Sequence, residues 1–157
     1  MKNCLGFEGL LKDALPLWEL LNDRISLDLH FLLIARLVSF RSICPQGRRH
    51  GAIVVREKRV LSMGYNGPPM GMTHCTICTL IESRGSKDWR TCPAVHSEVN
   101  ALLTAARFGI SVMGASLYVT KEPCDKCEAS MINAGIKDIV YYKEEGDLDY
   151  GRKKLSG

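Results

Sequence analysis

Residues 115–133, ASLYVTKEPCDKCEASMIN, decide the fold class of this chain. They place a short apolar strand over Ala115–Thr120 before a helix over Cys124–Asn133, and a second apolar strand follows over Ile136–Tyr142. Strands that alternate with helices favour a parallel or mixed sheet covered by helices. Ligands of such sheets bind beyond the carboxyl ends of the strands, which is where Cys124 is expected to lie.

The rest of the chain extends this alternation on both sides. In chain order we expect a helix over 27–40 capped by Ser26, strands over 51–55 and 60–65, a helix over 96–108 and a last short helix over 148–155. The sequence therefore predicts an α/β fold, with a three-layer α/β/α domain and a central mixed sheet over residues 27–157. Residues 1–26 are expected to be an N-terminal helical extension whose helix is broken at Pro16.

The composition limits the classes of function. A length of 157 residues suits one domain, and 46% hydrophobic with 24% charged residues argue against disorder. No run approaches the ~20 apolar residues of a membrane span, and the N-terminus lacks a secretory signal pattern, so we expect a cytoplasmic protein. The net charge of +4 suits a phosphate-bearing ligand but is small for a strong nucleic-acid binder.

The seven cysteines indicate metal or redox chemistry. They are Cys4, Cys44, Cys75, Cys78, Cys92, Cys124 and Cys127. Four of them form two Cys-x-x-Cys pairs, in a chain that we expect to stay in a reducing compartment. We therefore favour metal binding over disulfides.

One histidine and two of these cysteines have the spacing of a zinc centre. His96 opens a predicted helix, and Cys124 and Cys127 lie on the same side of the first turn of another. Three protein ligands leave one zinc position open for water, as in catalytic sites. Zinc lowers the pKa of that water toward ~7, and the carboxylate of Glu98 is placed to move its protons. These residues alone predict a zinc enzyme with Glu98 as general acid and base.

A structural zinc site is the alternative. Cys75, Cys78, Cys124 and Cys127 can also be read as a four-thiolate zinc ribbon in a binding module without catalysis. The separation of the two pairs is long for a ribbon. This interpretation also leaves Glu98 and the alternating strands and helices without a purpose, so we favour the enzyme.

A second group of candidate metal ligands lies between residues 74 and 92. It consists of His74, Cys75, Cys78 and Cys92. A Cys-x-x-Cys pair with a third cysteine fourteen residues later is a reasonable spacing for a structural zinc. Thiols this close together in a polar loop favour a metal over free buried thiols.

Three cations near the predicted strand ends are candidates for binding a phosphate. They are Arg48, Arg49 and Lys121. A phosphate needs a pocket of cations or backbone amides. Ordinary solvated surface cations are an equally good interpretation of each residue.

Further motifs resemble the deoxycytidylate (dCMP) deaminase family. The pattern His-x-Glu with Pro-Cys-x-x-Cys is typical of zinc-dependent nucleobase deaminases. The segments similar to dCMP deaminases are Arg41-Ser42-Ile43-Cys44, Gly51-Ala52-Ile53-Val54-Val55, Gly64-Tyr65-Asn66-Gly67-Pro68-Pro69, Gly114-Ala115-Ser116-Leu117-Tyr118-Val119-Thr120 and Asn133-Ala134-Gly135-Ile136-Lys137. The resemblance spans about residues 27–145.

The resemblance implies a cytidine-deaminase-like fold and a reaction. That reaction is the hydrolysis of dCMP to dUMP and ammonia, which supplies pyrimidine nucleotide for dTMP synthesis. In the family's pattern zinc is held at His96, Cys124 and Cys127. The activated water attacks C4 of the base, and Glu98 protonates N3 and then the leaving amine.

The resemblance also implies substrate contacts and partners. Asn66 would bind the sugar, and the backbone of Ala94 and Val95 would contact the pyrimidine edge. Cys44 joins the candidates for a second zinc. A homo-oligomer is expected, and a nucleotide effector such as dCTP or dTTP is possible for this family.

The chain departs from the family's pattern at four places, and one of them is the spacing from Cys44 to Gly51, which is one residue longer than is common. Ser97 stands where the family usually has alanine, and His50 stands where valine is common. The family often adds a strand after the last short helix, and we expect that strand to be absent here.

The nearest enzymatic alternative, a deaminase of bases in RNA or single-stranded DNA, needs a basic channel with aromatic side chains. Aromatic residues make up 7% of the chain, which disfavours it.

Overall fold

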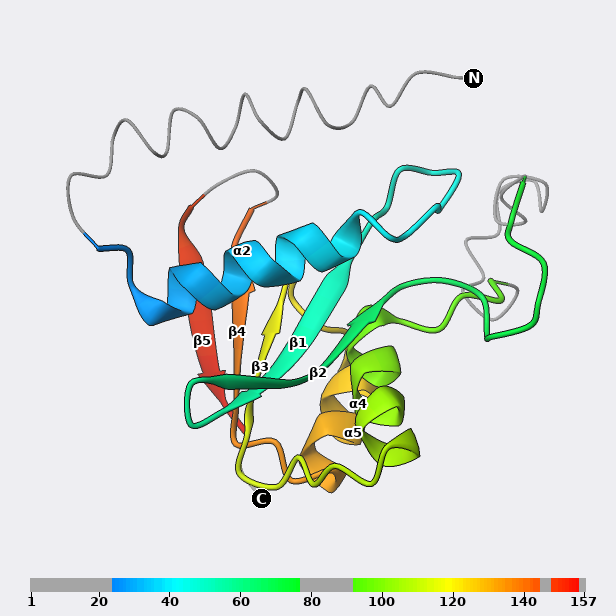
Figure 1. Ribbon diagram of the computed structural model, residues 1–157. Coiled ribbons are helices and arrows are strands. Elements are labelled where there is room, and N and C mark those ends of the chain that lie inside the picture. The colour runs from blue at the N-terminus through cyan, green and yellow to red at the C-terminus, as the bar shows by residue number, and fades with distance from the viewer. Residues whose placement is uncertain (1–23, 77–91, 145–147, 156–157) are drawn as a thin grey trace.

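The structure is a computed structural model that describes residues 24–76, 92–144 and 148–155. Its elements are α2 (Leu27–Ser39), β1 (Gly51–Arg56), β2 (Arg59–Tyr65), α4 (Ser97–Arg107), β3 (Ser116–Val119), α5 (Asp125–Asn133), β4 (Asp138–Tyr142) and β5 (Tyr150–Lys154) (Figure 1). This arrangement of helices around a sheet confirms the predicted α/β class. None of these helices is long and apolar enough to cross a membrane.

The five strands form one mixed sheet, as predicted, in the order β2-β1-β3-β4-β5. β3 and β4 are parallel and are connected through α5, whereas the other neighbouring pairs are antiparallel. Because β1 runs opposite to β3, the beginning of β1 meets the end of β3 at the same end of the sheet. The predicted phosphate-binding cations come from these two places in the chain.

Side chains that alternate along β1 divide the core into two layers. Ala52 and Val54 pack against the apolar side chains of α4 and α5. Ile53 and Val55 point to the other face of the sheet, where they pack against α2. The sheet is therefore covered by α2 on one face and by α4 and α5 on the other, which confirms the three layers (Figure 1).

The first described helix begins where the sequence predicts. The Ser26 hydroxyl accepts a hydrogen bond of 3.1 Å from the backbone N–H of Leu29, as a helix N-cap does. The helix ends at Ser39, one residue earlier than expected. The division at residues 26 and 27 stays a prediction, because residues 1–23 lie outside the described part of the chain.

The last short helix predicted over residues 148–155 is wrong, because Tyr150–Lys154 form the strand β5. Its backbone pairs antiparallel with β4, whose edge would otherwise be left without partners. Arg152 adds ion pairs to Asp28 of α2 at 2.6 Å and to Asp138 of β4 at 2.8 Å. The residues predicted to form the last helix therefore supply the edge strand of the sheet.

Gly64 of β2 lets the helix that carries the site lie directly on the sheet. A Cβ atom at this position would overlap the backbone oxygen of Ser97 and the backbone nitrogen of Ala101 in α4. Backbone atoms cannot give way as a flexible side chain can. The close approach of β2 and α4 therefore requires glycine here.

We expect Gly64→Ala to lower the free energy of unfolding by about 1–3 kcal/mol, the usual cost of overpacking. In a chain of this length that corresponds to a fall in Tm of about 2–12 °C. Thermal unfolding followed by circular dichroism measures it. Gly67→Ala is the matched control, since a Cβ there has its nearest neighbour at 4.0 Å. An equal Tm for the two variants would contradict the close-packing argument.

Candidate active site

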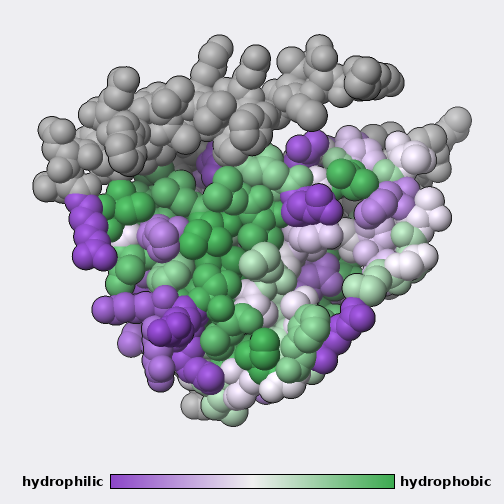
Figure 2. Space-filling model, viewed as in Figure 1, coloured by the Kyte–Doolittle hydropathy of each residue, from purple (hydrophilic) through white to green (hydrophobic). Residues whose placement is uncertain are grey.

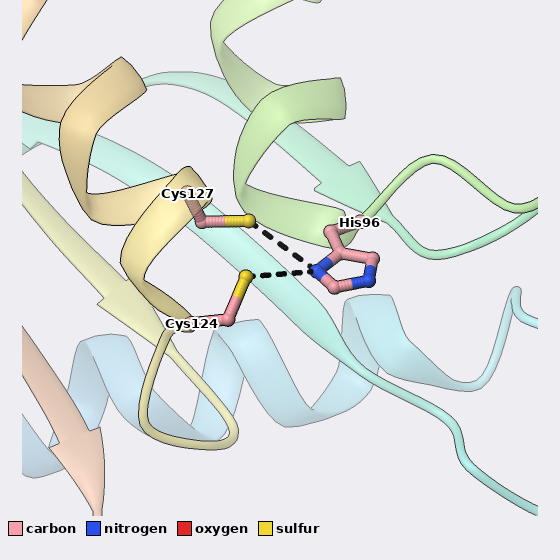
Figure 3. A group of neighbouring side chains, drawn as sticks. All are labelled: His96, Cys124 and Cys127. Carbon is pink, nitrogen blue, oxygen red and sulfur yellow. Dashed lines mark hydrogen bonds between the residues drawn. The ribbon is translucent and has the colours of Figure 1, made fainter. Parts of the chain in front are cut away.

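The starts of two helices bring the three predicted zinc ligands together. His96 is the N-cap residue of α4, and Cys124 is the N-cap residue of α5. Cys127 lies in the first turn of α5. Figure 3 shows the two thiol groups pointing toward the imidazole ring from the neighbouring helix. Helix N-termini stabilise thiolates, which favours both cysteines as metal ligands.

The spacing of the donor atoms fits a tetrahedral zinc site. Nδ1 of His96 lies 3.7 Å from Sγ of Cys124 and 3.3 Å from Sγ of Cys127 (Figure 3). Zn–N distances of about 2.0–2.1 Å and Zn–S distances of about 2.3 Å put a nitrogen and a sulfur ligand about 3.6 Å apart. Within the described ranges, this is the one group of three or more potential ligands whose donor atoms all lie within 4.8 Å.

The protonation chemistry of the cluster also calls for a cation. Burial raises the pKa of the Cys127 thiol far above its usual range, and the nearby Glu98 carboxylate and Cys124 sulfur raise it further. A divalent cation would act against this shift and favour the thiolate. One imidazole and two thiolates are ligands that Zn²⁺ prefers. The residues present fit zinc.

Glu98 is buried beside this cluster. Its exposed fraction is 6%, and it lies in the first turn of α4, where its carboxylate is close enough to the Cys127 thiol to raise the pKa of that thiol. The hydroxyl of Ser97, fully buried, donates a 2.8 Å hydrogen bond to Oε2 of Glu98. A buried carboxylate next to three metal ligands costs free energy, and its function accounts for that cost better than stability does.

The four-thiolate alternative does not describe this arrangement. Cys124 and Cys127 are grouped with His96, and Cys75 is not part of that group. Cys78 lies outside the described residues. The Cys-x-x-Cys pair of α5 therefore belongs to a site with one imidazole, two thiols and an adjacent carboxylate.

Asn66 holds the segment before β1 with both ends of its amide. Its Oδ1 accepts a 2.8 Å hydrogen bond from the backbone N–H of His50, and its Nδ2 donates a 2.8 Å hydrogen bond to the carbonyl of Arg48. Its backbone N–H donates to the carbonyl of His50 at 3.1 Å. Asn66 thus orders the chain that carries Arg48 and Arg49, a role that the sequence analysis did not predict.

The residues after Asn66 contact the segment that leads into His96. Gly67 and Val95 exchange two backbone hydrogen bonds, of 3.2 Å and 2.9 Å, and form an isolated β-bridge. Ala94 and Val95 therefore run beside the loop that follows β2, next to the helix start that holds His96. The segment predicted to contact the pyrimidine (Ala94–Val95) and the loop predicted to contact the sugar (Asn66–Gly67) therefore touch each other.

The three predicted phosphate ligands are exposed side chains near one end of the sheet. Arg48 and Arg49 precede β1, and Lys121 follows β3. Gly51 N–H donates to Oγ1 of Thr120 at 3.1 Å, and Thr120 N–H donates to the carbonyl of Gly51 at 3.1 Å. These bonds place the two cationic segments side by side at the end of the sheet where α5, with its two cysteines, begins.

Residues 26–143 match the family described as the cytidine and deoxycytidylate deaminase zinc-binding region. The match covers most of the chain and includes the whole cluster described above. The chain belongs to this family.

Named relatives agree with this assignment. ComE operon protein 2 of Bacillus subtilis is 39% identical over 125 residues, which are 78% of this chain and 62% of that protein. The deoxycytidylate deaminase of Mycobacterium phage D29 is 41% identical over 124 residues, which are 74% of this chain and 94% of the phage protein. The chain thus spans less than two thirds of the Bacillus protein and nearly all of the phage protein.

A solved structure shows the same fold. The dCMP deaminase of cyanophage S-TIM5, in complex with dCMP and dUMP, has a TM-score of 0.64 and 30% identity to this chain. The comparison covers 77% of this chain and 84% of the phage chain. The predicted cytidine-deaminase-like fold is confirmed.

In this member of the deaminase family, three predicted ligands of a second zinc line one pocket, but their sulfur atoms do not all lie within 4.8 Å of one another. Asn66, Gly67 and Ala94 also line this pocket, beside Cys44, Cys75 and Cys92. The three cysteines are free, partly buried thiols. His74 is exposed and does not line this pocket.

The sequence analysis missed two polar residues that organise the deaminase site. Thr120 joins the ends of β1 and β3 through its hydroxyl. Asn100 of α4 donates hydrogen bonds to two backbone carbonyls beside the site. The available signal for Asn100 was a weak helix former four residues after His96, on the same face of the predicted helix.

Proposed function

We propose that this chain is a deoxycytidylate deaminase that hydrolyses dCMP to dUMP and ammonia. The observation that carries the proposal is the buried Glu98 beside a His-Cys-Cys cluster with zinc-ligand spacing. A purely structural metal site has no use for that carboxylate. The names of the phage relative and of the cyanophage structure, which contains dCMP and dUMP, support the nucleotide substrate.

His96, Cys124 and Cys127 hold the metal in this proposal. Zinc bound there would lower the pKa of a water molecule, so that the water could lose a proton at neutral pH and become a nucleophile. Glu98 would carry a proton from that water to N3 of the cytosine ring while the water oxygen forms a bond to C4. A second proton passes through Glu98 to the amino group at C4, which leaves as ammonia while the ring keeps the oxygen of water. The Ser97 hydrogen bond holds Oε2 of the carboxylate during these transfers.

The substrate lies along the segments around Asn66. The backbone of Ala94 and Val95 contacts the edge of the pyrimidine, and Asn66 contacts the sugar with the hydrogen-bonding capacity that Arg48 and His50 leave free. Each amide oxygen has two lone pairs and each amide nitrogen two hydrogens, so one of each is available. Arg48, Arg49 and Lys121 bind the 5′-phosphate.

A second, structural zinc completes the proposed cofactor set. Cys44, Cys75 and Cys92 line one pocket, and His74 and Cys78 are the further candidates. Four of these five residues fill a tetrahedral site. Such a zinc would connect the segments that carry Cys44, Cys75 and Cys92.

Elemental analysis of the purified protein is expected to find about two zinc ions per chain, one for each proposed site. Replacing Cys75 and Cys78 together with serine should remove one zinc and leave the other. Cys4→Ser is the control, because this cysteine belongs to neither group. A single zinc that survives the double substitution would eliminate the second site.

The proposal extends to the assembly and the setting of the enzyme. We propose a homo-oligomer, because Figure 2 shows hydrophobic residues gathered over the face that carries α2 and β2, and Leu37 and Met63 on these elements are 55% and 52% exposed. We expect a second copy of the chain to cover this hydrophobic face.

We also propose a cytoplasmic enzyme whose residues 27–157 form the deaminase domain after the 1–26 extension. The proposed effector is a nucleotide such as dCTP or dTTP.

One assay separates this function from its alternatives. The zinc-loaded protein is mixed with dCMP, dCTP, cytidine, deoxycytidine or cytosine-containing oligonucleotides, and ultraviolet absorbance follows the loss of the amino group. We expect turnover of dCMP. Turnover confined to oligonucleotides would assign the chain to deaminases of nucleic acids, and no turnover of any compound would favour a non-catalytic zinc module.

A further inference from the structure

Asn100 connects two segments of the site from the helix that carries Glu98. It lies one turn after His96 in α4, and its backbone N–H donates to the His96 carbonyl at 3.0 Å. Its side-chain Nδ2 donates to the carbonyl of Tyr65 at 2.8 Å and to that of Val95 at 3.4 Å. The two amide hydrogens thus reach the end of β2 and the residue before the metal-binding histidine.

The two carbonyls belong to segments that hold the rest of the substrate site. Tyr65 precedes Asn66, whose amide orders the chain at Arg48 and His50. Val95 pairs with Gly67 through two backbone hydrogen bonds. The Asn100 amide therefore links α4 to both backbone segments that we propose to contact the nucleotide.

The choice of asparagine at this position has no local explanation. Asparagine is a weak helix former, and position 100 lies inside α4, beyond the N-cap position where asparagine is favoured. Alanine would favour the helix, but it has no group to donate to the two carbonyls. A residue with two amide hydrogens fits both acceptors.

We propose that Asn100 is a positioning residue for deamination. Its hydrogen bonds fix the positions of the Tyr65–Gly67 loop and the Ala94–Val95 segment relative to the carboxylate of Glu98. It acts through these backbone segments and touches neither the metal ligands' donor atoms nor the reacting atoms. This inference rests on the proposed deaminase function.

Asn100→Asp tests the proposal, because it keeps the size of the side chain and removes its amide hydrogens. The carboxylate would also repel the two carbonyl oxygens. We expect kcat for dCMP to fall ~10–100-fold, the scale of a small misplacement of the substrate, while KM changes less than about 3-fold. Zinc content should equal that of the unchanged protein. Asn133→Ala, at an exposed asparagine of α5, is the matched control.

Amide hydrogen exchange supplies a readout that does not depend on activity. Without the Asn100 amide, the Gly67 and Val95 N–H groups should exchange at least ~10-fold faster, since their bridge opens more often. If the unchanged protein does not turn over dCMP, the proposed function fails. The exchange measurement still tests whether the Asn100 amide holds the Gly67–Val95 bridge.

Three results would overturn the proposal. They are an unchanged kcat in folded Asn100→Asp, a loss of zinc by that folded variant, or exchange at Gly67 and Val95 equal to that of the control. Should Asn100→Asp not fold, Asn100→Ala takes its place with the same expected changes. A failure of both variants to fold would assign Asn100 a structural role instead.

Discussion

Glu98→Ala is expected to lower kcat for dCMP at least ~10²-fold, while the protein stays folded and keeps its catalytic zinc. A positioned proton shuttle is worth about 10²–10⁴-fold in rate. Glu98 is the buried carboxylate next to the three metal ligands, and one of its oxygens is already held by Ser97. Steady-state kinetics, elemental analysis and a thermal melt of the same preparation make the measurement.

The control for Glu98→Ala is Glu144→Ala, which removes an exposed carboxylate after β4. It should leave all three measurements unchanged. Loss of zinc in Glu98→Ala would make Glu98 a metal ligand rather than a proton carrier. Loss of the cooperative melt would make it a structural residue.

A preference for dCMP over deoxycytidine of about 10²–10⁴-fold in kcat/KM is expected from the cations beside the site. A hydrogen bond between charged groups contributes ~1.5–3 kcal/mol, and every 1.4 kcal/mol is about tenfold in affinity. Two such bonds to the 5′-phosphate produce this range. The measurement compares kcat/KM for the two compounds with the same enzyme preparation.

Single alanine substitutions of Arg48, Arg49 and Lys121 should reduce this preference. The phosphate is bound alike in the ground state and the transition state, so KM should rise more than kcat falls. Lys58→Ala is a suitable control, because this exposed cation lies in the turn between β1 and β2, at the opposite end of β1. Equal kcat/KM for deoxycytidine and dCMP would contradict the nucleotide monophosphate as substrate.

Local spacing made the metal centre readable from the sequence. Cys124 and Cys127 are three residues apart at the start of a helix, and 3.6 residues per turn place them on one side whatever else the chain does. Glu98 lies only two residues after His96 at the start of another helix, so proximity along the chain keeps its carboxylate near that ligand. The alternation of strands and helices likewise predicted the mixed sheet and its three layers.

The last strand depended on partners far away in the sequence. Residues 150–154, YGRKK, carry no apolar periodicity, so the residues themselves do not select a strand. The open edge of β4 selected it, since its backbone groups need hydrogen-bond partners. The ion pairs of Arg152 with Asp28 of α2 and Asp138 of β4 add side-chain contacts that hold the strand in this position.

The sequence by itself determined which residues can bind zinc, which carboxylate accompanies them, and the class of the fold. These properties follow from short-range geometry and from hydrophobic periodicity. The tertiary structure alone decided that the starts of α4 and α5 meet, and that the amides of Asn66 and Asn100 hold backbone segments around the site. The hydrogen bonds of Asn66 with Arg48 and His50, and that of Asn100 with Tyr65, join residues 16 to 35 positions apart. The packing of β2 against β1 and α4 brings their donors and acceptors within hydrogen-bonding distance.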